Sequence, residues 1–235
     1  MKTLFLIPAR GGSKGIPNKN IIELASKPLI GYTIEECLKI SKLYDCEICV
    51  STDSYNIKTV AEKYGLTIPF IRPDNLSTDT ATSESVLLHA IDWYQNSGIN
   101  FDLVVLLQPT SPLRKSNHII EAINFYIENA NKDIDMVVSV KVSKANPYFN
   151  LFEENENGML FKSIKSSYTR RQDCPTTFEY NGAIYIISVK SLREKGILNF
   201  DKIKKYEMDD ISSLDIDEPI DLEFCDFFIK KRKHN

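Results

Sequence analysis

Two short segments near opposite ends of the 235-residue chain carry residue types suited to phosphate chemistry. The first, residues 8–20, places three glycines and three cations directly after a short apolar run, Thr3–Ile7. Glycines let backbone N–H groups approach phosphate oxygens closely, and Arg10, Lys14 and Lys19 offset phosphate charge. The pattern predicts a loop that binds a nucleoside triphosphate, although its spacing is not that of a Walker loop or a dinucleotide-binding fingerprint. The alternative is an ordinary strand-to-helix turn with solvent-facing lysines.

The second segment is a short alternation of aliphatic and acidic residues close to the C-terminus. Leu214 and Ile216 alternate with Asp215 and Asp217, so an extended backbone places both carboxylates on one face and both aliphatic side chains on the other. Paired carboxylates suit Mg²⁺, which commonly takes one or two carboxylates plus substrate phosphates. The alternative is that Asp217 or Glu218 caps a C-terminal helix with Pro219 in its first turn.

Further polar side chains stand where a ligand is expected in an α/β fold. Gln108 follows the apolar run Leu103–Leu107, and the carboxyl ends of parallel strands are favoured ligand positions. Arg72 can grip a phosphate or a ribose, and the hydroxyl of Ser83 can bind a ligand or serve near a helix cap. Arg171 lies in a polar run over residues 168–173. Two roles are open for it: contact with an anionic substrate, or a place on the solvent-exposed surface.

The elements that must position these residues follow an alternating strand and helix pattern through the first 140 residues. Stripes of apolar residues at helical spacing begin at residues 30, 57, 87 and 119, and a further helix is expected from Pro219 to Lys231. This alternation predicts an α/β fold with a doubly wound, mostly parallel sheet. The strands expected in it are Thr3–Ile7, Glu47–Ser51, Thr67–Phe70, Leu103–Leu107 and Met136–Lys141.

The alternation of strand and helix patterns ends after residue 141. Turn-rich polar segments predict a β-hairpin excursion over about residues 142–180, and residues 181–187 return as a core strand. We therefore expect one domain over residues 1–235 with a small β-rich excursion. The basic run at residues 230–233 is expected to be a frayed, solvated tail.

Composition narrows the function classes. The formal net charge of −3 argues against a general nucleic-acid binder, and the absence of a long apolar run argues against a membrane protein and a signal peptide. Five scattered cysteines indicate reduced thiols, and Cys46 and Cys49 would face opposite sides of one strand rather than share a metal. A cytoplasmic enzyme acting on a small anionic ligand is the expectation.

The first segment, residues 7–21, resembles the first motif of the acylneuraminate cytidylyltransferases, the CMP-sialic acid synthetases. The resemblance continues in order along nearly the whole chain, and the first motif is specific. The further matching segments are Val50–Asp53, Arg72 with Ser77–Asp79, Leu107–Leu113, Arg170–Asp173, Asn181–Tyr185 and Leu214–Asp217.

This resemblance implies a Rossmann-like nucleotidyltransferase fold whose excursion exchanges contacts in a homodimer. It implies a reaction of CTP with a nonulosonic acid that gives the CMP-sugar and pyrophosphate, with Mg²⁺, or Mn²⁺ in its place, as cofactor. Neither nucleic acid nor a membrane is an expected partner. N-acetylneuraminate is the first choice of acceptor, with legionaminate, pseudaminate and the deaminated nine-carbon acid as alternatives. A non-catalytic nucleotide sensor on the same fold is a more remote alternative.

The resemblance also assigns residues, carried over by motif. Asp215 and Asp217 bind the metal, and Asp215 is the best general-base candidate. The catalytic set adds Arg10, Lys19 and Arg171. The nucleotide-binding residues are Arg10, Gly11, Gly12, Ser13, Lys14, Lys19, Asn20, Arg72 and Ser83. The residues expected on the sugar side or bordering it are Gln108, Arg171, Gln172, Asn181 and Tyr185.

Two departures from the family pattern lie on the sugar side. Glu179 stands where some relatives have an arginine, and residues 147–149 stand where some sialate-specific relatives have a lysine. The nucleotide side keeps its pattern, so the use of CTP is the firmer expectation and the acceptor acid stays open.

Overall fold

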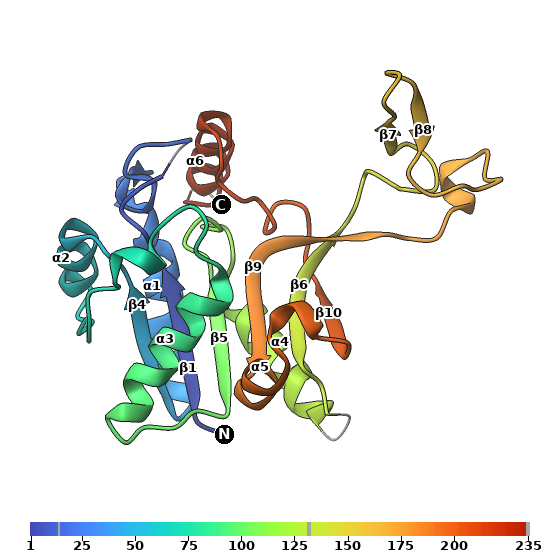
Figure 1. Ribbon diagram of the computed structural model, residues 1–235. Helices are drawn as coiled ribbons and strands as arrows, with labels where there is room; N and C mark the ends of the chain where they lie inside the picture. Colours follow the sequence, from blue (N-terminus) through green and yellow to red (C-terminus); the bar gives the residue numbers. More distant parts are fainter. Residues whose placement is uncertain (14, 131–132, 234–235) are drawn as a thin grey trace.

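The computed structural model describes residues 1–235 except 14, 131–132 and 234–235. Within the described residues, six strands form one sheet in the order β10-β6-β9-β5-β1-β4, with helices on both faces (Figure 1). The six strands are β1 (Thr3–Pro8), β4 (Cys46–Ser51), β5 (Leu103–Leu107), β6 (Met136–Val142), β9 (Phe178–Ser188) and β10 (Ile203–Glu207). The helices are α1 (Leu29–Ile40), α2 (Tyr55–Lys63), α3 (Ser83–Asn96), α4 (Ser116–Glu128), α5 (Val189–Lys195) and α6 (Pro219–Lys233).

The sheet is mostly parallel. Strand β1 pairs in parallel with β4 and β5, and β6 pairs in parallel with β10. Strand β9 alone among these runs antiparallel, between β5 and β6. The predicted fold class, a doubly wound and mostly parallel α/β sheet, is confirmed.

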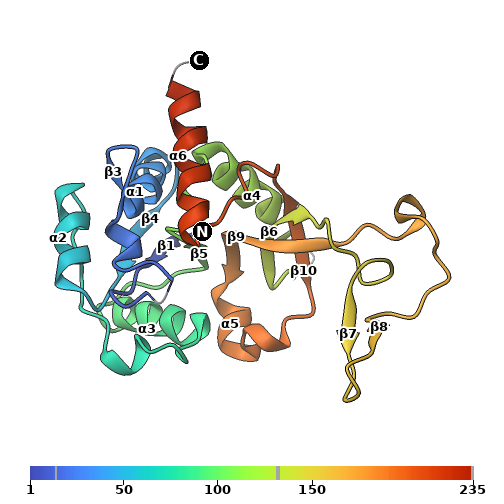
Figure 2. The same ribbon diagram turned by 90° about the horizontal axis from the view of Figure 1, so that it is seen from above.

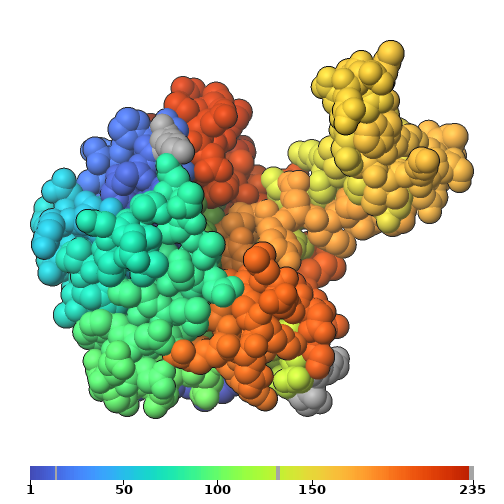
Figure 3. Space-filling model, viewed as in Figure 1, coloured from blue at the N-terminus to red at the C-terminus, as the bar shows by residue number. Residues whose placement is uncertain are grey.

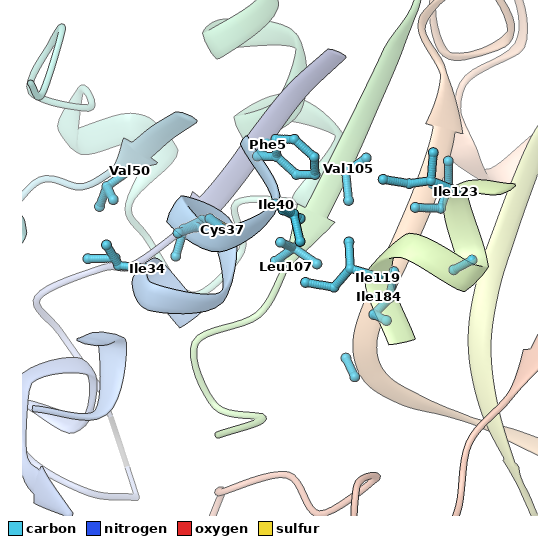
Figure 4. Packing of buried hydrophobic residues seen from close by; sticks show 14 of the residues in the cluster. Phe5, Ile34, Cys37, Ile40, Val50, Val105, Leu107, Ile119, Ile123 and Ile184 are labelled. Atoms are coloured by element: carbon cyan, nitrogen blue, oxygen red, sulfur yellow. The ribbon is translucent and has the colours of Figure 1, made fainter. Parts of the chain in front are cut away.

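Apolar side chains on the two faces of the sheet form separate cores. Helices α1, α2 and α4 cover one face, where Phe5 packs with Ile34 and Cys37 (Figure 4). Helices α3 and α5 cover the other face, which contains Cys49. Because Cys46 packs on the first core and Cys49 on the second, the expected opposite orientation of these two cysteines is confirmed.

Helix α6 packs over the edge of the sheet where strands β1 and β5 end. Its Cys225 and Ile229 form a third apolar cluster with Ile216 and with Leu24 of the short hairpin β2 (Glu23–Leu24) and β3 (Lys27–Pro28). Ile216 is fully buried there, as the alternation around the acidic pair predicts. This cluster anchors the segment that carries Asp215 and Asp217.

Residues 143–177 leave the sheet between β6 and β9 and form an arm that projects from the body of the protein (Figures 1 and 2). The space-filling view shows the tip of the arm separated from the body (Figure 3). The arm contains the predicted hairpin, as β7 (Phe152–Glu154) paired with β8 (Leu160–Lys162), and a short 3-10 turn, Arg171–Asp173.

Two sequence predictions are wrong. Residues 67–70 form no strand: Ile68 is buried in the core, but Pro69 has no N–H to donate and no ladder forms beyond β4 at the sheet edge. The basic run 230–233 does not fray, because α6 continues through it and Arg232 donates to the Leu113 carbonyl at 3.2 Å. In the described part of the chain, no helix has the length and apolar character needed to cross a membrane.

Candidate active site

A cavity of about 620 Å³ opens at the edge of the sheet where β1 and β5 end and β9 begins. This is the edge at which doubly wound sheets bind their ligands. Residues from both ends of the chain, from two intervening loops and from strand β9 meet there. The predicted site residues that line the cavity are Arg10, Ser13, Lys19, Asn20, Arg72, Ser83, Gln108, Tyr185, Asp215 and Asp217.

The glycine-rich loop after β1 is held by hydrogen bonds to its backbone. The Gly11 N–H donates to the Asp53 carboxylate at 2.8 Å, and the Asn20 amide donates to the Arg10 carbonyl at 2.9 Å. At Gly15 a Cβ atom would lie 2.7 Å from the Asp217 carbonyl oxygen, so a side chain there would displace the loop. Gly11 and Gly12 shape the loop without lining the cavity, and the predicted phosphate ligand Lys14 lies outside the described residues.

Lys19 joins the two segments that the sequence singled out. Its ammonium group donates to the Ile216 carbonyl at 2.8 Å and to the Asp217 carboxylate at 3.0 Å. At the start of α6, the Asp221 carboxylate accepts from the backbone N–H groups of Asp217 and Glu218 at 3.0 and 2.8 Å. Glu218 directly precedes the first helical residue, whereas the Asp217 carboxylate bonds Lys19.

Asp215 lines the cavity with a carboxylate that is largely buried. Among the described residues its Oδ1 atom has no hydrogen-bond partner. Burial raises the pKa of Asp215, and the neighbouring Asp217 charge adds to this, while a hydrogen bond from Thr110 opposes it. A buried carboxylate oxygen without a partner, beside a second carboxylate, is the donor set that a hard cation requires.

The residues that could hold a cation are these two carboxylates. Within the described residues, no three His, Cys, Asp or Glu side chains gather as a metal cluster. A site with two protein carboxylates fits a cation that takes its other ligands from phosphate and water.

Cationic groups also line the cavity. Arg10 pairs with Asp79 at 2.7 Å. Arg72 is buried, donates to the Ser77 hydroxyl at 3.2 Å and lies 3.9 Å from Asp53; burial lowers the pKa of its guanidinium group. These groups can bind an anionic ligand.

The N-terminus of α3 opens onto the same cavity. Thr82 caps the helix by accepting from the Ser85 N–H at 3.1 Å, and Ser83 is the first helical residue. Both Thr82 and Ser83 line the cavity. The exposed N–H groups and dipole of a helix N-terminus favour negatively charged ligands, so this end of α3 complements the cationic side chains.

Another part of the cavity wall carries Gln108 from the end of β5 and Tyr185 from β9. Burial raises the pKa of Tyr185, with a smaller contribution from the Asp215 charge. Asn181 lies behind this wall: its amide donates to the Ser213 hydroxyl at 2.8 Å and accepts from the Ser139 hydroxyl at 2.6 Å. Asn181 therefore ties the acidic segment to β9 from behind the cavity.

The structure does not bring Arg171 and Gln172 to this cavity. Both are exposed on the arm, where the Arg171 guanidinium donates to the Lys144 carbonyl. None of the arm residues lines the cavity of its own chain. Any role of these two residues at a cavity requires the arm of a second copy or a different arm position.

Two contributing residues carried no clear sequence signal. Asp53 ends one matching motif, but only the fold shows that it contacts the loop after β1. Arg114 directly follows the motif Leu107–Leu113 and is buried, whereas an arginine after a proline-rich loop is expected to be exposed.

A family model described as cytidylyltransferase matches residues 4–233. A pseudaminic acid cytidylyltransferase from Campylobacter jejuni subsp. jejuni serotype O:23/36 is 36% identical over 231 residues, which cover 98% of this chain and 97% of that relative. An N-acylneuraminate cytidylyltransferase from Escherichia coli O18:K1:H7 is 37% identical over 228 residues, which cover 95% of this chain and 51% of that relative.

Among solved structures, a CMP:2-keto-3-deoxy-manno-octonic acid synthetase complexed with CTP is similar, with a TM-score of 0.71 at 16% identity. The match covers 99% of this chain and 100% of that one. At this identity the likeness concerns the fold, and it agrees with the doubly wound sheet described above.

Proposed function

This chain belongs to the cytidylyltransferase family, and on that premise we propose that it transfers the CMP group of CTP to a nonulosonic acid and releases pyrophosphate. The observation that carries the proposal is the single cavity in which the glycine-rich loop, Arg72 and the α3 N-terminus face Gln108, Tyr185 and the acidic pair. One wall suits a triphosphate and the other a polar acceptor beside the reacting phosphorus.

In this proposal the nucleotide lies against the cationic wall. The anomeric hydroxyl of the acid attacks the α-phosphorus in line, a new P–O bond forms, and the bond to pyrophosphate breaks. Arg10 and Lys19 stabilise the charge that builds on the departing pyrophosphate. Positioning and electrostatics then supply most of the rate, without a covalent enzyme intermediate.

Asp215 and Asp217 are the residues that would hold Mg²⁺. When bound, the cation would offset charge at the phosphates and orient their oxygens. The fit rests on the partnerless, buried Oδ1 of Asp215 and on the exposed carboxylate of Asp217 beside it. Asp215 is also the candidate for the general base that takes the proton of the attacking hydroxyl, directly or through water.

We further propose that two copies of the chain exchange their arms. The arm exposes Phe152, Leu160 and Phe161, and apolar side chains gathered on so small a unit favour burial against a partner. An exchanged arm would place Arg171 and Gln172 beside the cavity of the partner subunit.

Mixing two inactive variants tests this exchange. Asp217→Asn and Arg171→Ala chains, unfolded and refolded together, form mixed dimers in which one site has both native residues. Recovery of about a quarter of wild-type activity in the mixture, the statistical expectation for random pairing, supports the proposal. Recovery of none, with dimers present, contradicts it.

The acceptor is a nonulosonic acid, with N-acetylneuraminate placed first. Relatives named for pseudaminic acid and for N-acylneuraminate are almost equally similar to this chain, so identity alone does not select among the acids. Glu179, at an arm–sheet junction, pairs with Lys141 at 2.9 Å and accepts from the Ser143 hydroxyl at 3.0 Å. Some relatives have an arginine where this chain has Glu179. This difference is the reason to test legionaminate, pseudaminate and the deaminated nine-carbon acid together with N-acetylneuraminate.

The experiment is pyrophosphate release with Mg²⁺ and CTP across this panel of acids, with ATP, GTP and UTP as controls. Release that depends on CTP and on one acid is expected. A folded protein that binds CTP but releases no pyrophosphate with any acid would instead support a nucleotide sensor.

A further inference from the structure

Arg114 is a charged side chain buried in the protein without a carboxylate partner. It is 3% exposed, and no ion pair joins it to an Asp or Glu among the described side chains, although Asp215 and Glu36 are near enough to influence it. Burial lowers the pKa of its guanidinium group to about 10, so it remains a cation at neutral pH. An unpaired buried charge is costly, which raises the question of what Arg114 does.

Its hydrogen bonds tie three elements together. The Nη1 atom donates to the Gln108 carbonyl at 3.0 Å and to the Ala183 carbonyl at 2.8 Å. The Nη2 atom donates to the Thr33 hydroxyl of α1 at 2.6 Å. Among the described residues its Nε atom has no partner.

The two carbonyls mark the point where the β5–β9 ladder ends. The last paired residues are Leu107 and Ile184, and the next residue on each strand is Gln108 or Ala183. The Nη1 atom of Arg114 donates to both carbonyls. It therefore links the two strands just beyond their last paired residues, at the end of the ladder near the cavity. The Thr33 hydroxyl also donates to the Gln108 carbonyl, at 3.4 Å.

The residues beside this closure form the acceptor wall. Gln108 and Tyr185 line the cavity, and a Cβ atom on Gly182 would lie 3.3 Å from the Asp215 carboxylate, so β9 approaches that carboxylate closely. Arg114 itself does not line the cavity. It therefore acts on any ligand only through the elements that it holds.

We infer that Arg114 is a positioning residue for the acceptor side of the reaction. It holds the ends of β5 and β9 at the separation that places Gln108, Tyr185 and Asp215 around the acid. The inference rests on the proposed function, because it concerns the acid that accepts the CMP group. The nucleotide side depends on other contacts: the loop after β1 and Arg72 are held by Asp53, which lies in the loop after the edge strand β4.

Two conservative variants test this role. Arg114→Lys keeps the charge and loses the planar fork that reaches both carbonyls and Thr33. Thr33→Val removes one acceptor of that fork at a residue that does not line the cavity. Arg193→Lys, at an exposed arginine of α5 that bonds Asp92 at 2.6 Å, is the matched control.

The readouts are the KM and kcat for the acid that supports wild-type activity, and the Kd for CTP by calorimetry. For Arg114→Lys we expect kcat/KM for the acid to fall about tenfold or more, because small displacements of reacting groups have large effects. The Kd for CTP stays within about twofold of wild type. Thr33→Val gives a smaller loss of the same kind, and the double variant loses less than the product of the two single losses because both act in one network. Arg193→Lys matches wild type.

Three results would overturn the inference. Unchanged kcat/KM in Arg114→Lys would show that the fork positions nothing. Equal losses in CTP affinity and in acid use, with a lower melting temperature, would show a general structural role. Multiplicative losses in the double variant would separate Thr33 from the network. A wild-type protein inactive with every acid contradicts the proposed function itself, whereas an active wild type with any of these three results contradicts the positioning role alone.

Discussion

The ammonium group of Lys19 lies 3.0 Å from the carboxylate of Asp217, a residue 198 positions away in the chain. This contact joins the loop that suits a triphosphate to the acidic pair that suits a cation. Gly15 reinforces the junction, because its missing side chain lets the loop approach the Asp217 backbone. If the proposed function holds, phosphate and cation would bind in one site.

The first prediction concerns Asp217. In Asp217→Asn the Lys19 contact keeps an oxygen acceptor but the carboxylate charge is lost, so we expect kcat to fall about 100-fold or more. The Kd for CTP measured without metal changes little, because the cationic wall is intact. Glu218→Gln, which neutralises the adjacent carboxylate, is the control and stays close to wild type. Near-normal turnover in Asp217→Asn would contradict the metal assignment.

The second prediction concerns the pair formed by Arg10 and Asp79, 2.7 Å apart. A triphosphate that binds Arg10 must compete with the Asp79 carboxylate for the same guanidinium group. Both side chains are partly exposed, so the effect is modest: Asp79→Asn tightens CTP binding by about two- to fivefold, and Arg10→Ala weakens it by about tenfold or more. Calorimetry at low and high salt measures both. Weaker binding in Asp79→Asn would mean that this carboxylate contacts the nucleotide.

A third prediction follows from Asp53, which accepts from the Gly11 N–H at 2.8 Å and lies 3.9 Å from Arg72. Asp53→Ala leaves both groups without this partner, and we expect the Kd for CTP to rise about tenfold. Asp53→Asn keeps an oxygen for the Gly11 N–H, so its loss is smaller. If the two variants bind CTP like wild type, the loop after β1 does not need this tie.

The strands of the sheet show most clearly which parts of the fold could be predicted from the sequence. Strands such as β1 and β5 are buried on both faces, so their runs are almost wholly apolar and could be predicted. Strand β10 could not: it is an edge strand, and Ile203-Lys-Lys-Tyr-Glu207 carries the lysines that discourage edge pairing. The sequence of residues 67–70 resembles a strand because Ile68 and Phe70 are apolar at alternate positions, although Pro69 prevents the ladder.

The same holds within the site. The residue types within the loop after β1 and within the acidic pair are unusual enough to mark both segments as candidate binding segments. They could therefore be identified before their positions in the fold were known. Contacts between distant segments could not be, because nothing local to Asp53 or Arg114 records what lies across from it. The position of Arg171 depends on the path of a long arm, which local patterns do not fix.

The fourth prediction concerns pH. Burial alone would raise the pKa of Asp135, but hydrogen bonds from Ser191, Lys195 and the Lys202 backbone outweigh it and hold this pKa well below its usual range. A carboxyl whose pKa is lower in the folded state stabilises the fold above its unfolded pKa of about 4 and loses this contribution as the pH falls further. We expect the free energy of unfolding to fall between about pH 4 and pH 2.

The control is Asp135→Asn, which cannot titrate at this position. It is less stable than wild type at neutral pH, and its stability depends less on pH in the acid range. Parallel curves for the two proteins, from urea unfolding at each pH, would contradict this assignment.

The central claim is the transfer of CMP from CTP to an acid, and ³¹P NMR of the reaction mixture tests it most directly. With CTP, Mg²⁺ and the accepted acid, we predict that the triphosphate signals are replaced by one phosphodiester signal of the CMP-sugar and by pyrophosphate, in equal amounts. The phosphodiester signal is absent with Asp217→Asn over the same time. Formation of free CMP with pyrophosphate, or no consumption of CTP with any acid of the panel, would contradict the account.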